Sequence, residues 1–162
     1  MEYRRYRHPG ASYFFTLVTR DRQPVLTTEP VRTLLREALA SVRVDRPFHI
    51  DAMVLLPDHL HTIWTLPEGD SNFATRWRLI KSHVVKAYGQ ALWQKRYWEH
   101  FLRDDLDYRR HVDYVHFNPV KHGMVKAVAD WPFSSFHRWV GEGVYPVDWG
   151  GRVPDLVGVG RE

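Results

Sequence analysis

Apolar residues recur with two different periods along this chain of 162 residues. Aromatic and β-branched residues dominate residues 13–19, which predicts a strand, and a second strand is predicted over residues 48–56. Apolar positions at helical spacing predict helices over residues 28–44 and 72–88. A third strand is expected at residues 61–66, apolar enough to lie centrally in a sheet.

The remaining pattern completes an alternation of strands and helices. Residues 97–102 predict a fourth strand and residues 104–117 a third helix, which we expect to end at Asn118 because a residue before proline leaves the helical region. The short turn at Pro57-Asp58 predicts an antiparallel hairpin. This order predicts an α+β, ferredoxin-like or RRM-like antiparallel sheet with helices packed on one face.

Composition indicates one folded domain. Apolar residues make up 44% of the chain, enough for a core, and we expect a single domain over residues 1–150. The glycine-rich residues 151–162 are expected to form a loose tail. Cysteine is absent, which excludes disulfides and thiolate zinc sites. We expect a cytoplasmic protein, because the sequence shows neither a secretory signal nor an apolar run of the ~18 residues that span a bilayer.

His59 and His61 form the first candidate for chemistry. Residues two apart on a strand point to the same face, so two imidazoles there offer a platform for a metal ion. The pair alone is weak evidence, because the chain has ten histidines. Two surface histidines at a strand edge are the simpler explanation.

Tyr114 and Asn118 form the second candidate. They are four residues apart and therefore share one face of the third predicted helix. Alone, this spacing is also typical of a half-buried tyrosine in an ordinary core. Tyr108 lies six residues before Tyr114 and thus on a different face, which argues against a mechanism with two tyrosines.

Together the two candidates suggest one reaction. A phenol is a poor nucleophile at neutral pH, but it can attack a phosphodiester that a divalent cation polarises. Two histidines and an amide oxygen leave Mg²⁺ or Mn²⁺ with open positions for phosphate oxygens. Attack by Tyr114 would conserve the bond energy in a phosphotyrosine ester, which suits strand transfer better than hydrolysis.

Four segments of the sequence resemble one family, the REP-associated tyrosine transposases, a branch of the HUH single-strand nucleases related to single-tyrosine insertion-sequence transposases. The likeness extends from about residue 13 to residue 151. The matching segments are residues 55–69 (LLPDHLHTIWTLPEG), 92–107 (LWQKRYWEHFLRDDLD), 113–125 (DYVHFNPVKHGMV) and 131–140 (WPFSSFHRWV).

The resemblance assigns the roles of the site residues. It places the metal-binding pair on His59 and His61 and the nucleophile on Tyr114. It also implies a ferredoxin-like fold, a divalent metal, and binding of single-stranded DNA that folds into palindromic hairpins. Insertion-sequence relatives carry glutamine as the third ligand, whereas this chain has the shorter Asn118, which puts direct coordination in question. Relatives in this group act as monomers or as homodimers that exchange the tyrosine helix.

Hairpin DNA requires phosphate contacts, which lysine and arginine supply. The net charge of +4 does not by itself indicate a nucleic acid partner. Bases can stack on aromatic side chains, for which we consider Trp93, Tyr97 and Trp98. The expected phosphate contacts are Arg4, Arg5, Arg7, Arg76, Arg78, Lys81, Lys95 and Arg96.

Two other functions remain open. One is a DNA-binding protein of the same fold that does not cut, and the other is a zinc hydrolase with water as nucleophile. The segment Trp98-Glu99-His100 receives no role from the sequence, although Glu99 is a candidate to orient a metal ligand or to pair with Arg103.

Overall fold

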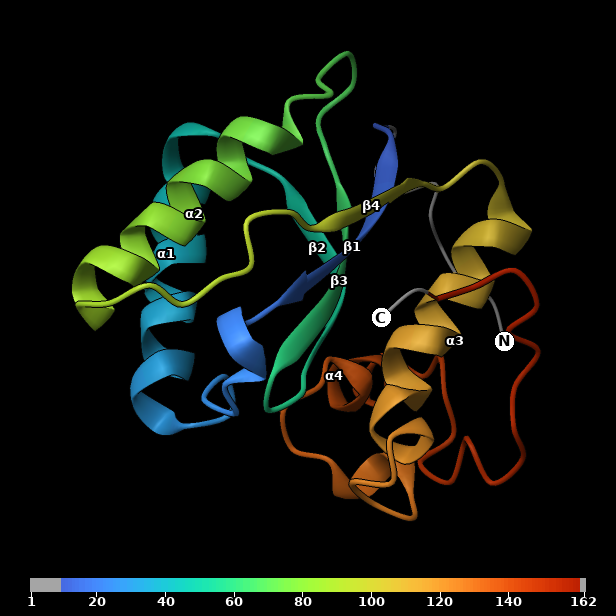
Figure 1. The fold of residues 1–162 in the computed structure, drawn as a ribbon. Coiled ribbons are helices and arrows are strands. Elements are labelled where there is room, and N and C mark those ends of the chain that lie inside the picture. The colour runs from blue at the N-terminus through green and yellow to red at the C-terminus, as the bar shows by residue number, and fades with distance from the viewer. Residues whose placement is uncertain (1–9, 161–162) are drawn as a thin grey trace.

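The computed structural model describes residues 10–160 and contains one antiparallel sheet of four strands in the order β2-β3-β1-β4 (Figure 1). This is the expected ferredoxin-like arrangement. The strands are β1 (Ser12–Val18), β2 (His49–Leu55), β3 (His59–Thr65) and β4 (Trp98–Phe101). The helices are α1 (Glu29–Asp45), α2 (Phe73–Tyr88), α3 (Asp105–Lys121) and α4 (Phe136–Gly141), with short 3-10 turns η2 (Arg20–Arg22) and η3 (Val128–Asp130).

Strand β3 is the buried centre of the sheet. All seven of its residues are buried, as the apolar run predicted. The strand begins at His59, two residues earlier than expected, because the Leu56 amide donates to the His59 carbonyl at 2.8 Å and closes a tighter turn. Both histidines of the pair therefore lie within the strand.

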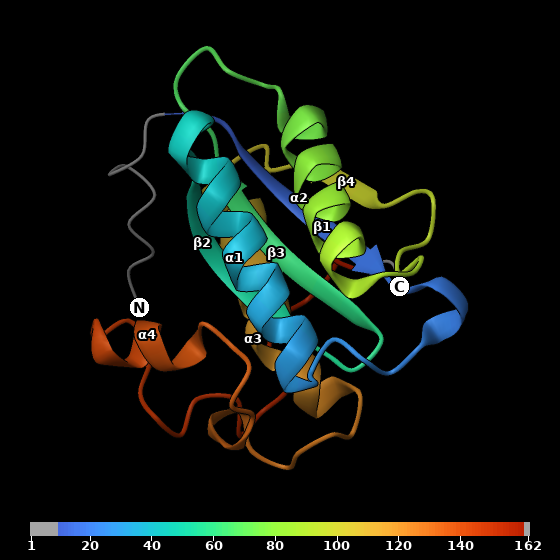
Figure 2. The same ribbon diagram turned by 90° about the vertical axis from the view of Figure 1, so that its left-hand side faces the viewer.

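The sheet carries helices on both faces (Figures 1 and 2). Helices α1 and α2 cover one face, and their apolar sides pack on Phe15, Leu17 and Trp64. Helix α3 lies against the other face and buries Phe14 and Ile63. Helices α1 and α2 match the expectation of helices on one face, whereas α3 lies on the opposite face. The third helix creates the second interior, which holds the functional side chains.

Helix α3 continues beyond its expected end. It runs through Pro119 to Lys121, so the prediction that Asn118-Pro119 ends the helix was wrong. The proline ring removes one helical hydrogen bond. The amide of His122 nevertheless bonds the Asn118 carbonyl at 3.0 Å, and burial of both Asn118 and Pro119 favours one more turn. This extra turn brings Lys121 and His122 to the face that carries Tyr114.

Among the described residues, no helix combines the length and the apolar character needed to cross a membrane.

Candidate active site

The two histidines of β3 lie side by side on the face of the sheet that α3 covers. Their ring centres are 5.0 Å apart, and the exposed fractions of His59 and His61 are 3% and 0%. Pairing with β1 places His59 opposite Val18 and His61 opposite Thr16. The expected face-sharing pair is therefore present, but it lies in the interior and not at an exposed strand edge.

A neighbouring side chain orients each imidazole. Nδ1 of His59 lies 2.7 Å from a carboxylate oxygen of Asp58, and Nδ1 of His61 lies 2.7 Å from the hydroxyl of Thr16. With Nδ1 of each ring engaged in this way, Nε2 is the nitrogen that would bind a metal, as in carboxylate–histidine–metal arrangements. Burial opposes ionisation of Asp58, but the hydrogen bond from His59 and the charge of Arg22 outweigh it and lower the pKa of this carboxyl.

The C-terminal half of α3 faces this pair. Tyr114, Asn118 and His122 are four residues apart and share one side of the helix. The Tyr114 ring lies 5.2 Å from the His61 ring, and the His122 ring lies 5.0 Å from the His59 ring. Asn118, fully buried, is therefore held between these two contacts.

These residues fit a divalent cation. Within residues 10–160, the buried Nε2 of His59 has no hydrogen-bond partner, which is costly unless another ligand satisfies it. Two imidazole nitrogens and an amide oxygen form a neutral ligand set that leaves the full charge of the ion for phosphate oxygens. His59, His61 and Asn118 are the side chains that would hold such an ion.

The Tyr114 hydroxyl also contacts a cation from its own helix. The Lys121 ammonium donates to this oxygen at 3.2 Å and lies 4.9 Å from the ring centre. A fixed positive charge there stabilises the negative charge that develops on the oxygen when the phenol reacts. Lys121 is itself exposed, so this contact lies toward the surface.

The C-terminal segment covers Tyr114, whose exposed fraction is only 1%. A Cβ atom added to Gly160 would lie 2.7 Å from the phenol ring, so the backbone passes directly over it. Arg110 pairs with Asp155 at 2.9 Å, and Leu156 packs on the hydrophobic cluster that contains Tyr114. Residues 151–160, for which we expected no fixed contacts, thus lie against α3 in this structure.

The basic residues expected to contact DNA fall into four groups, of which the fourth is Arg76 alone. Arg4, Arg5 and Arg7 lie outside the described residues. Arg78, Lys95 and Arg96 are exposed. Lys81 is partly buried, and burial lowers the pKa of its ammonium group.

Arg76 requires a correction. Its side chain is 3% exposed and pairs with Asp70 at 2.8 Å. It also donates to the main-chain carbonyls of Arg46 and Pro47. A guanidinium with these partners joins α2 to the end of α1 and is not available to a phosphate. The sequence pattern did not distinguish Arg76 from Arg78, because both lie on α2 and differ only in the side of the helix from which they project.

Sequence reasoning missed three contributors to the site. Asp58 was interpreted only as a turn residue, although its position directly before His59 is a usable signal. Thr16 lies on another strand, and only the register of β1 with β3 reveals its contact with His61. Lys121 was placed beyond the expected end of the helix.

Comparisons with known proteins identify the family of the chain. The family described as "Transposase IS200 like" matches residues 8–117. A REP-associated tyrosine transposase of Escherichia coli (strain K12) is 54% identical over 156 residues, covering 96% of this chain and 94% of that protein. A Haemophilus influenzae protein with the same name, given provisionally, is 41% identical and covers 95% of each chain.

A solved structure shows the same fold. The structure titled as a REP-associated tyrosine transposase bound to a REP hairpin has a TM-score of 0.85 and 52% sequence identity, with coverage of 100% of this chain and 98% of that one. These matches confirm the expected fold and the expected class of enzyme, one with a tyrosine nucleophile. The chain belongs to the IS200-like transposase family, in its branch of REP-associated tyrosine transposases.

Proposed function

We propose that this protein cuts single-stranded DNA beside a palindromic hairpin and joins the 5′ phosphate to Tyr114. The single observation that carries the proposal is the 5.2 Å approach of the Tyr114 ring to His61, with His59 beside it. Under this proposal His59, His61 and Asn118 bind Mg²⁺ or Mn²⁺. A bound cation of this kind would polarise the scissile phosphate and offset charge in the transition state.

The chain's own residues perform the remaining steps. The Tyr114 oxygen attacks the phosphorus as its proton passes to solvent, and the bond from phosphorus to the 3′ oxygen breaks as that oxygen takes a proton from solvent. The products are a 5′-phosphotyrosine ester and a free 3′ hydroxyl, which can reverse the attack. Lys121 stabilises the phenolate as it forms, and Asp58 and Thr16 hold the imidazoles in place.

The proposed DNA partner is a REP-type hairpin with single-stranded flanks. One relative was solved bound to a REP hairpin, which supports this choice. Arg78, Lys81, Lys95 and Arg96 remain proposed phosphate contacts, as do Arg4, Arg5 and Arg7 outside the described residues. Trp98 is the strongest candidate to stack on a base, because it is 40% exposed and lies opposite Thr16, which in turn lies opposite His61.

We propose that the reaction occurs within one chain. Tyr114 already lies beside His61 of the same molecule, so no exchange of α3 between two copies is required. This arrangement favours a monomer over a homodimer that swaps the tyrosine helix. Residues 1–150 would form the catalytic domain and residues 151–162 a tail, of which residues 151–160 would leave Tyr114 when DNA binds. A chromosomal DNA substrate would place the protein in the cytoplasm.

A covalent adduct tests the proposal. Wild-type protein with Mn²⁺ and a 3′-labelled hairpin oligonucleotide should retain the label on protein in a denaturing gel. Tyr114→Phe should reduce this adduct by about a thousandfold or more, since the nucleophile is lost, while hairpin affinity stays nearly unchanged. Tyr108→Phe is the matched control, because the Tyr108 hydroxyl donates to Asp51 at 2.6 Å.

The alternatives predict different results. A zinc hydrolase would still cut the DNA after Tyr114→Phe and would form no adduct with the wild-type protein. A binding protein would shift the hairpin in a native gel without cutting it. Either result would replace the proposed mechanism.

A further inference from the structure

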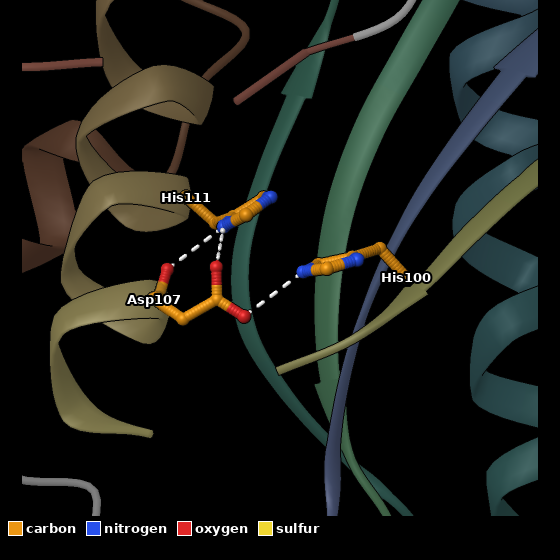
Figure 3. Close-up of side chains that lie close together, drawn as sticks. All are labelled: His100, Asp107 and His111. Carbon is orange, nitrogen blue, oxygen red and sulfur yellow. Dashed lines mark hydrogen bonds and ion pairs between the residues drawn. The ribbon is translucent and has the colours of Figure 1, made fainter. Parts of the chain in front are cut away.

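A second group of metal-binding side chains lies between β4 and α3, separate from the pair on β3. It consists of His100 on β4 and of Asp107 and His111 on the first turns of α3 (Figure 3). One nitrogen or oxygen from each residue lies within 4.8 Å of the other two. It is the one such group of three found among residues 10–160, and the proposed reaction does not use it.

The distances within the group suit a shared ion. Nε2 of His100 is 2.9 Å from Oδ2 of Asp107, and Nδ1 of His111 is 3.3 Å from Oδ1 of the same carboxylate. Ligands held roughly 2.1 Å from a zinc-like ion are about 3.0 to 3.4 Å apart at angles between 90° and the tetrahedral value. The carboxylate therefore stands at ligand distance from both imidazoles, which stack with their centres 4.7 Å apart.

The ionisation of the carboxylate favours cation binding. Burial opposes it, but hydrogen bonds from the main chain and guanidinium of Arg103 and from His100 outweigh burial and hold the pKa of Asp107 at about 2. The Arg103 side chain is 71% exposed and is free to swing away from an arriving cation. The sequence left Glu99 as a candidate partner of Arg103, but Arg103 pairs with Asp107 and not with Glu99.

We propose that His100, Asp107 and His111 form a second binding site for a divalent transition-metal ion, with Zn²⁺ the best match. Two imidazoles and one carboxylate are a common ligand set for zinc. On binding, the proton on each ligating nitrogen moves to the other nitrogen of its ring. Before metal binding, the Asp107 carbonyl accepts from His111 Nδ1 at 2.7 Å. After metal binding, this carbonyl keeps its main-chain acceptor role in the helix.

The site is reachable from solvent and close to the proposed catalytic centre. The His100 side chain is 28% exposed, which provides a route for the ion and an open position for water. Phe14 separates the two sites, with its ring centre 4.9 Å from His111 and 5.5 Å from His61. An ion here would join the edge strand that carries Trp98 to the helix that carries Tyr114.

Metal titration tests the second site. The double variant His59→Ala/His61→Ala, which lacks the first site, should bind about one equivalent of Zn²⁺ by calorimetry at neutral pH. Addition of His100→Gln to that variant should weaken the remaining binding at least tenfold. Co²⁺ in place of Zn²⁺ should produce visible absorption bands that the same substitution removes.

The wild-type protein offers a second measurement in case the double variant does not fold. It should bind two equivalents of Zn²⁺, and His100→Gln should reduce this number to one. His83→Gln, an exposed histidine on α2, is the matched control and should bind as the wild type does. If His100→Gln left the number of bound Zn²⁺ ions unchanged, the proposal would be overturned. The three side chains would then be a hydrogen-bonded group that holds β4 to α3. Adduct formation by Tyr114 is a separate readout, so the two proposals can fail independently.

Discussion

Three side chains at the proposed catalytic centre each contact one neighbour that orients them or, in the case of Lys121, stabilises charge on the reacting oxygen. Asp58 holds His59, Thr16 holds His61, and Lys121 contacts Tyr114. Such partners fix the orientation of a ligand and raise its basicity. At the scale of the residue, the site therefore depends on side chains that do not touch the substrate.

Removal of the Asp58 carboxylate should weaken metal binding without blocking the reaction. Asp58→Ala frees the His59 ring to rotate, so the affinity for Mn²⁺ should fall about 10- to 100-fold. Adduct formation should be slow at limiting Mn²⁺ and should recover at excess Mn²⁺. Asp45→Ala, an exposed carboxylate at the end of α1, serves as the control. A defect that excess metal does not repair would show that Asp58 acts in another way.

Helices α2 and α3 each carry side chains with two different roles. Helix α3 supplies Tyr114 and Asn118 from the side that faces β3, and Asp107 and His111 from its first turns. Its last turn exists because burial of Asn118 and Pro119 outweighs the preference against helix before proline. Helix α2 turns Arg78 to solvent and Arg76 to the interior.

The two arginines of α2 should separate stability from DNA binding. Arg76→Gln leaves Asp70 and two carbonyls without their donor and should lower the free energy of unfolding by about 3 kcal/mol. Arg78→Gln should leave stability within about 0.5 kcal/mol and should weaken hairpin binding with a smaller salt dependence. Urea unfolding and salt-dependent binding assays measure the two effects. A stable Arg76→Gln protein with weak hairpin binding would contradict the assignment.

At the scale of the whole molecule, the C-terminal segment closes the interior between the sheet and α3. Gly160 and Leu156 contribute to this cover, and Asp155 attaches it to Arg110. The contacts are few and the Asp155 side of the ion pair is exposed, so displacement of the segment should cost little free energy.

Removal of this segment should make Tyr114 more reactive. A chain that ends at Arg152 no longer places backbone over the phenol, so the rate of adduct formation should rise by about tenfold or more. Asp155→Ala removes the ion pair with Arg110 and the hydrogen bond from the Val157 amide, and its effect should be at most about fivefold. Single-turnover cleavage of a labelled hairpin measures both variants. An unchanged rate in the shortened chain would mean that the segment does not limit access.

A buried histidine should make the fold sensitive to mild acid. His116 is fully buried, and burial, followed by the charges of Arg138 and His137, lowers its pKa to about 3. The unfolded chain takes up this proton near pH 6.5 and the folded chain does not, so stability falls as the pH drops below 6.5 toward 3. At pH 5 the loss from this residue is about 2 kcal/mol.

Urea unfolding at several pH values tests whether stability falls as the pH drops. The free energy of unfolding of the wild-type protein should decline between pH 6.5 and pH 5. His116→Gln should reduce that slope, even though it also loses the contacts to Tyr145 and Ser135. His137→Gln, exposed on the same side of the molecule, should keep the wild-type slope. Equal slopes in all three proteins would mean that His116 is protonated in the folded state.

The sequence by itself determined the elements and the reactive residue types. Periodicity is a local property, so the four strands, helices α1 and α2, most of α3 and the shared faces of His59 with His61 and Tyr114 with Asn118 were predictable, whereas α4 and the last turn of α3 were not. Tertiary structure decided which of these faces meet. Tyr114 and His61 are 53 residues apart in the sequence, and only the sheet order β2-β3-β1-β4 with α3 across it brings them together. The same holds for the burial of Arg76, the Thr16 contact and the tail over Tyr114, because each depends on the packing of distant segments and not on local spacing.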